Sequence, residues 1–156
     1  MLKRRYFTAC LIAVVLTCFS GAAIFAQSDI DDHRSCSQCG MDRKAYGYSR
    51  MLIRYLDGAE VGVCSLHCAV VDMDANKARA VQSLLVADRD TRALIDVEKA
   101  IWVVGGTKRG VMTRRPAWAF ASRTAADAFM RSYGGEIAAW SDVLASARSE
   151  AALMHR

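Results

Sequence analysis

The alternation of apolar and polar residues predicts a β-hairpin in the first third of the chain. Residues 51–56 and 61–64 are mostly apolar, and Asp57-Gly58 lies between them. An Asp-Gly pair suits the positive backbone angles of a tight hairpin turn. The two runs are therefore expected to pair as antiparallel strands.

A helix is predicted directly after this hairpin. Ser65 is a suitable N-cap, and apolar residues follow at the i, i+3, i+4 and i+7 positions of one helical face: Leu66, Ala69, Val70 and Met73. The apolar run at 83–87 predicts the next strand.

The second half of the chain has a similar pattern. A strand at 100–104 ends at Gly105-Gly106, and a strand at 118–121 leads into a helix. Thr124 and Asp127 resemble a capping box in that helix, and its expected buried stripe is Ala125, Ala128, Phe129 and Tyr133, stopped by Gly134-Gly135. A last helix is predicted at about 138–151.

Both halves thus place a strand directly before a helix. Aligning residues 64–73 with 121–130 gives three identities in ten positions, which indicates an internal duplication. We expect an α+β fold with two small ββα-like halves, at about 36–90 and 91–150, that share one core within a single domain at 36–150.

The N-terminal segment has the layout of a secretory signal peptide. Three basic residues at 3–5 precede an apolar run at 7–19 and then small residues, so residues 1–26 are expected to be the signal, with cleavage after Ala26 or Ala23. An uncleaved anchor and a lipid on Cys18 are the alternatives. We expect a periplasmic or otherwise extracytoplasmic protein, associated with the membrane if Cys18 is lipidated or the signal is retained.

Composition and charge narrow the function further. The chain has 53% hydrophobic residues and one proline, which is typical of a folded globular protein, and residues 27–35 are polar and are expected to form a flexible lead. Removing residues 1–26 takes away three basic residues and no acidic ones, so the net charge falls from +5 to +2. That balance gives no electrostatic footprint for nucleic acid, and the pairs Lys108-Arg109 and Arg114-Arg115 are interpreted as solvated loop residues.

Four cysteines remain after the signal: Cys36, Cys39, Cys64 and Cys68. A Cys-x-x-Cys turn directs two sulfurs to one side, and a helix N-terminus stabilises thiolates, so knuckle, hairpin and helix start have the order of a treble-clef-like metal site. Two structural disulfides and a redox dithiol at Cys36 and Cys39 are the alternatives in an oxidising compartment. A thioredoxin-like motif would follow a strand and open a helix, whereas a polar segment precedes this one.

The donor set distinguishes two metals. Four thiolates, or three thiolates and His67, suit tetrahedral Zn²⁺. Met41 directly follows the knuckle, and Met112 lies in a loop after Gly110; thioethers beside thiolates suit Cu(I) better. Met51, Met73 and Met130 lie on expected buried stripes and are interpreted as core residues. The sequence shows no recognisable catalytic constellation, so an enzyme is not expected.

The ordered set of motifs resembles the NosL family. The matching segments are Cys36-Ser-Gln-Cys-Gly-Met41, Cys64-Ser65 after the Asp-Gly hairpin, Lys99-Ala-Ile-Trp-Val-Val-Gly105, Arg109-Gly-Val-Met112, and Ala125-Ala-Asp-Ala-Phe129 with Tyr133-Gly-Gly135. The resemblance implies an exported Cu(I) metallochaperone that supplies copper to an acceptor enzyme such as nitrous oxide reductase. It also implies two halves related to those of organomercurial lyase.

By position, the resemblance implies that Cys36, Cys39, Met41 and Met112 belong to the family's site. Two features of this chain depart from the family pattern. His67 and Cys68 accompany Cys64 where many members have only the first cysteine, and Thr-Arg-Arg-Pro116 follows Met112 where small residues are expected. A richer coordination, and zinc as a competing metal, follow from the first departure.

Overall fold

The computed structural model describes residues 25–154, so the predicted signal peptide up to residue 24 and Cys18 lie outside the described residues. The helices are α1 (Phe25–Asp32), α2 (Leu66–Ala75), α3 (Arg123–Tyr133) and α4 (Trp140–Met154). The strands are β1 (Met51–Tyr55), β2 (Glu60–Val63), β3 (Val81–Ala87), β4 (Leu94–Asp96), β5 (Ile101–Val104), β6 (Ala117–Phe120) and β7 (Glu136–Ala138). None of these helices has the length and hydrophobicity needed to cross a bilayer.

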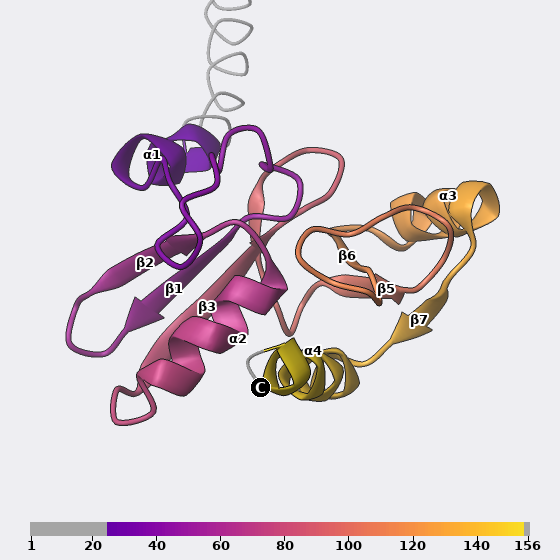
Figure 1. The fold of residues 1–156 in the computed structure, drawn as a ribbon. Coiled ribbons are helices and arrows are strands. Elements are labelled where there is room, and N and C mark those ends of the chain that lie inside the picture. The colour runs from indigo at the N-terminus through magenta and orange to yellow at the C-terminus, as the bar shows by residue number, and fades with distance from the viewer. Residues whose placement is uncertain (1–24, 155–156) are drawn as a thin grey trace, which may run out of the picture.

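The strands form two antiparallel sheets, which confirms the predicted α+β class (Figure 1). The strand orders are β2-β1-β3-β4 and β6-β5-β7. In both sheets a hairpin supplies an inner and an outer strand, a helix follows the outer strand, and the next strand returns to the free side of the inner one. The two halves therefore repeat one topology, as the weak internal similarity predicted.

The predicted hairpin and its following helix are confirmed. Strand β1 pairs with β2 in the register Met51 to Val63 and Ile53 to Val61, across the Asp57-Gly58 turn. Ser65 is the N-cap of α2, and its side chain accepts a hydrogen bond from the backbone N–H of Cys68. This cap satisfies one of the free N–H groups of the first turn.

One large core joins the two halves. It contains Met51 and Ile53 from the first sheet together with Trp102 and Val104 from the second, and Val143 from α4. Helix α4 packs against α2 of the first half (Figure 1). Trp140 stacks on Trp102 at 5.2 Å between ring centroids. The C-terminal helix thereby closes the core of the first half.

Several expectations differ from the structure. The segment at 27–35 is not a flexible lead, because most of it belongs to α1 or to the ordered chain that follows, and the Asp29 side chain is buried. The first sheet extends to Asp96 through β4, beyond the expected boundary at residue 90. Ser122, and not Thr124, is the N-cap of α3, and this shift buries Ala126 while Ala128 is exposed.

Candidate metal centre

The sulfur atoms of Cys36, Cys39, Cys64 and Cys68 meet at one point, where all four lie within 4.8 Å of one another. The Sγ atom of Cys39 lies 3.5 Å from that of Cys64, and the Sγ atom of Cys68 lies 3.7 Å from both. A tetrahedral ion with bonds of about 2.3 Å to sulfur requires sulfur-to-sulfur distances of about 3.8 Å. The four thiols therefore have the spacing of ligands around one ion, and they form one site and not two.

The Cys36 to Met41 turn directs the first two thiols inward. The Cys36 N–H donates to the Met41 carbonyl at 2.8 Å, and the Gly40 N–H donates to the Cys36 carbonyl at 2.9 Å. Gly40 has φ +76, a conformation that favours glycine because other residues pay a steric cost there. The Ser37 N–H and hydroxyl both donate to the Gly62 carbonyl, at 3.0 and 3.1 Å, and attach the turn to β2.

The second pair of thiols is placed by β2 and α2. Cys64 directly follows the last residue of β2, and Cys68 lies in the first turn of α2 behind the Ser65 cap. The extended Ser65 cap turns the chain between the strand and the helix, and the two sulfurs lie 3.7 Å apart across this turn. Cys36, Cys64 and Cys68 are buried, whereas Cys39 is exposed.

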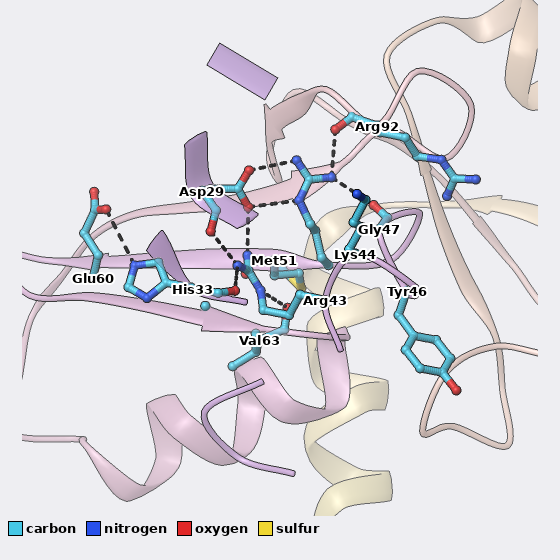
Figure 2. A network of polar contacts seen from close by, with 12 residues as sticks. Asp29, His33, Arg43, Lys44, Tyr46, Gly47, Met51, Glu60, Val63 and Arg92 are labelled. Atoms are coloured by element: carbon cyan, nitrogen blue, oxygen red, sulfur yellow. Dashed lines mark hydrogen bonds and ion pairs between the residues drawn. The ribbon is translucent and has the colours of Figure 1, made fainter. Parts of the chain in front are cut away.

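A buried network of ion pairs lies next to the end of β2 that leads into Cys64 (Figure 2). The Arg43 side chain is fully buried and donates from Nη2 to Asp29 Oδ2 at 2.8 Å, and from Nε to the Val63 carbonyl at 3.2 Å. Arg50 donates to both oxygens of the same carboxylate, from Nε at 2.9 Å and from Nη2 at 2.8 Å. Arg43 thus connects α1 to the residue directly before Cys64.

The same network explains two local features of the chain. Burial alone would raise the pKa of Asp29, but the hydrogen bonds and charges of Arg50 and Arg43 lower it below its usual value. A side chain at Gly62 would clash with the Cβ of His33 and lie 2.7 Å from the Arg43 guanidinium carbon. The chain after α1 therefore packs directly on the β2 backbone.

The thiols differ in acidity because they bond to one another. The pKa of Cys64 is lowered to about 5 despite its burial. The largest cause is the hydrogen bond from Cys68, followed by those from Cys39, Ser65 and Cys36. Desolvation of its sulfur among the neighbouring thiols raises the pKa of Cys39 to about 11, although the residue as a whole is exposed, and the hydrogen bond to Cys64 raises the pKa of Cys68. The favoured thiolate is buried and the exposed thiol is protonated, which is unfavourable for disulfide exchange with an outside partner because a reactive cysteine must be both ionised and accessible.

The other predicted ligands lie in different surroundings. Met41 is partly buried and packs against the core cluster that includes the three buried cysteines. His67 is 8% exposed and lines a small cavity of about 30 Å³ between the halves, together with Trp102 and Val111. Met112 is 41% exposed in the β5–β6 loop, where it has a φ of 54. The four-cysteine group does not include His67, and the ligand roles of Met41, His67 and Met112 stay predictions.

Two further expectations about these residues can be compared with the structure. Met51 is fully buried, and Met73 and Met130 are partly buried against the two core clusters, so their interpretation as core residues is confirmed. The sequence pattern does not predict that Asp29, Arg43 and Arg50 support the site. Their only signal in the sequence is the presence of charged residues on both sides of the knuckle.

The fold and the site define a class: an α+β protein with two antiparallel sheets and a thiol cluster able to hold one metal ion. The family model described as NosL matches residues 27–147, and the chain belongs to the NosL family, as its motifs predicted. Among solved structures, the crystal structure of the copper chaperone NosL from Shewanella denitrificans is similar, with a TM-score of 0.56 and 21% sequence identity over 70% of this chain and 89% of that one. At this identity the likeness establishes a shared fold. The comparison with curated proteins found no match.

Proposed function

We propose that this protein is an exported Cu(I) metallochaperone, which carries copper as cargo and is not an enzyme. The observation that carries the proposal is the cluster of four thiols within 4.8 Å, of which only Cys39 is exposed. A carrier must release its ion, and a site with one accessible ligand gives an acceptor a place to attack. Family membership and the similarity to a copper chaperone support this function.

The choice of Cu(I) rests on the softness of the donors. The cluster holds four thiols, and Met41 places a thioether at the end of the same turn. Thiolates and thioethers favour Cu(I), whereas oxygen and nitrogen donors favour harder ions. We propose that the copper ligands are drawn from Cys36, Cys39, Cys64, Cys68 and Met41.

A structural Zn²⁺ site is the second candidate, because four thiolates at tetrahedral spacing suit zinc equally well. The order of knuckle, hairpin and helix start is also that of treble-clef-like zinc sites. Small zinc domains commonly depend on the metal to fold. Here Met51, Ile53, Val63 and Trp102 are fully or almost fully buried in a core shared by both halves, so we expect the metal-free chain to remain folded.

The proposed cellular role extends the family resemblance. An extracytoplasmic location follows from the predicted signal peptide, and membrane association from lipid on Cys18 or a retained signal. The partners are a protein that delivers copper and an acceptor enzyme such as nitrous oxide reductase. Isolation of the processed protein with determination of its N-terminus tests the location, and copper transfer to a purified acceptor tests the partner.

The ion is tested by anaerobic titration of the reduced protein. The copper proposal expects one Cu(I) per chain, bound tightly enough to compete with a Cu(I) chelator, and a circular dichroism spectrum that is unchanged when the metal is removed. Replacing Cys64 with Ser should abolish competition, whereas replacing Ser49, which contacts the Cys64 carbonyl from outside the cluster, with Ala should not. Negligible Cu(I) affinity, or unfolding on removal of bound zinc, would overturn the proposal in favour of the structural site.

A further inference from the structure

A second cluster of functional side chains, basic and aromatic, lies away from the thiols in a pocket between the two halves. Its volume is about 390 Å³, and its lining is Tyr48, Arg89, Arg92, Lys108, Arg109 and Trp118. Arg89 and Arg92 come from the β3–β4 turn, and Lys108 and Arg109 from the β5–β6 loop. The fold therefore gathers two pairs of basic residues that are distant in the sequence, one of which had been interpreted as solvated loop residues.

The cations of this pocket are held in place by aromatic rings. The Arg92 guanidinium lies 5.1 Å from the centroid of the Tyr48 ring, and the Lys108 Nζ lies 4.8 Å from that of Tyr133. Tyr48 in turn stacks on Trp118 at 5.9 Å. Cation–π contacts of this kind restrict flexible side chains before a ligand arrives, which lowers the entropy cost of binding.

The backbone that carries the arginines is also fixed. Arg92 has a φ of 67, and its carbonyl accepts a hydrogen bond at 2.8 Å from Arg50, a member of the buried network (Figure 2). The Arg89 N–H donates to the Ala119 carbonyl of β6 at 2.8 Å. The turn is thus attached both to the Asp29 network and to the second sheet, and its side chains project from a rigid base.

The charge of the pocket is poorly compensated. Arg89 forms an ion pair with Asp90 at 2.5 Å, but among residues 25–154 no carboxylate pairs with Arg92, Lys108 or Arg109. Trp118 is buried, and its Nε1 has no hydrogen-bond partner in the described part of the chain. Buried donors without partners are uncommon in folded proteins, because each one loses its hydrogen bond to water.

We propose that this pocket binds a polycarboxylate. Its polar groups are almost all donors, which selects a ligand rich in acceptors, and planar guanidinium groups match carboxylates geometrically. A single monovalent carboxylate is too small and too weakly charged for four cations spread over two loops. The same chemistry is offered by a free small polycarboxylate and by neighbouring Asp or Glu side chains of a protein partner. The site is separate from the thiols, so this proposal does not depend on the copper function.

The test follows the indole N–H signals of the full chain by ¹H–¹⁵N NMR at constant ionic strength. The chain has three tryptophans. Trp118 reports on the pocket, and Trp102 is an internal control because its Nε1 already donates to the Val97 carbonyl at 2.8 Å. The probes are propane-1,2,3-tricarboxylate, as the free form, and a hexaglutamate peptide, as the side-chain form.

We expect a saturable shift of the Trp118 signal with at least one probe, while the Trp102 signal stays in place. Replacing Arg109 with Gln should weaken binding about fivefold to tenfold, since a charge-assisted hydrogen bond is lost at an exposed position. The matched control is Arg114→Gln, which removes another exposed arginine of the same loop that does not line the pocket. Arg92→Gln is a second test variant, on the β3–β4 turn that forms the other side of the pocket.

The two probes distinguish the sources. Tighter binding of the tricarboxylate assigns the pocket to a free metabolite-like anion, and tighter binding of the peptide assigns it to an acidic segment of a partner. Absence of a saturable shift up to about 10 mM of either probe would overturn the proposal, because weaker binding is worth less than about 3 kcal/mol. Equal weakening by Arg109→Gln and Arg114→Gln would overturn it as well, since general charge screening would then explain the effect.

Discussion

Replacing Asp29 with Asn should strongly destabilise the protein, because this one carboxylate is the ion-pair partner of two fully buried arginines, Arg43 and Arg50. Asp29 accepts three hydrogen bonds from Arg43 and Arg50, at 2.8, 2.9 and 2.8 Å. Asparagine keeps the shape but removes the charge, and it turns one acceptor into a donor that faces guanidinium N–H groups. Removing one partner from a buried ion pair costs about 3–5 kcal/mol, which is a large part of the roughly 5–15 kcal/mol that stabilises a typical domain.

The assay is urea unfolding, followed by circular dichroism, of the wild type and the variant near pH 7. A loss of this size corresponds to a melting temperature lower by about 10–20 °C for a domain of this length. The matched control is Asp31→Asn, which makes the same chemical change at an exposed position of α1 and should alter the free energy of unfolding by about 0.5 kcal/mol or less. If Asp29→Asn lies within about 1 kcal/mol of the control, the reasoning from the buried network is refuted.

The pH dependence of the free energy of unfolding gives an independent check on the direction of the Asp29 pKa shift. The pKa of Asp29 is lower in the folded protein than in the unfolded chain, so its contribution is complete above the unfolded value of about 4. The contribution declines as the pH falls below that value and through the folded pKa. The difference in stability between wild type and Asp29→Asn should therefore be constant from about pH 5 to pH 8 and shrink in acid. A difference that grows as the pH falls would contradict this assignment.

Three smaller predictions concern the surroundings of the thiols. Gly62→Ala should lower the free energy of unfolding by about 1–3 kcal/mol, measured by urea titration, because the new methyl group clashes with the chain after α1. Met41→Leu should lower the Cu(I) affinity in a chelator competition, whereas the exposed Met112→Leu should leave it unchanged; the reverse order would make Met112 the ligand. His67→Gln should keep the Cu(I) affinity, since His67 lines the cavity between the halves, and a loss comparable to that of Cys64→Ser would restore it as a ligand.

The elements that were predicted correctly are those with strong local signals. The Asp57-Gly58 turn, the Ser65 cap and the glycines after Tyr133 all act within a few residues, so the sequence pattern is sufficient to locate them. The convergence of the four cysteines followed from the same elements, because a hairpin returns the chain and a helix start orients the second pair.

The features that were missed depend on contacts between distant residues. Helix α1 has no apolar periodicity. The ion-pair partners of Asp29, which are Arg43 and Arg50, lie 14 and 21 residues further along the chain. Strands β4 and β7 have three residues each, too few for an alternating pattern to be recognised. The basic pocket was missed for a similar reason, since only the packing of the two halves brings Arg92 close to the loop that carries Lys108 and Arg109.

The position of α4 has a consequence for how the chain unfolds. The helix is the last element of the second half, yet it packs on α2 and buries Val143 in the core that contains Cys64 and Cys68. Neither repeat can be excised as an autonomous module, because each would lose part of its interior. A chain with this crossing is expected to unfold as a single cooperative unit, so a ligand that binds the thiols of one half would also stabilise the strands of the other.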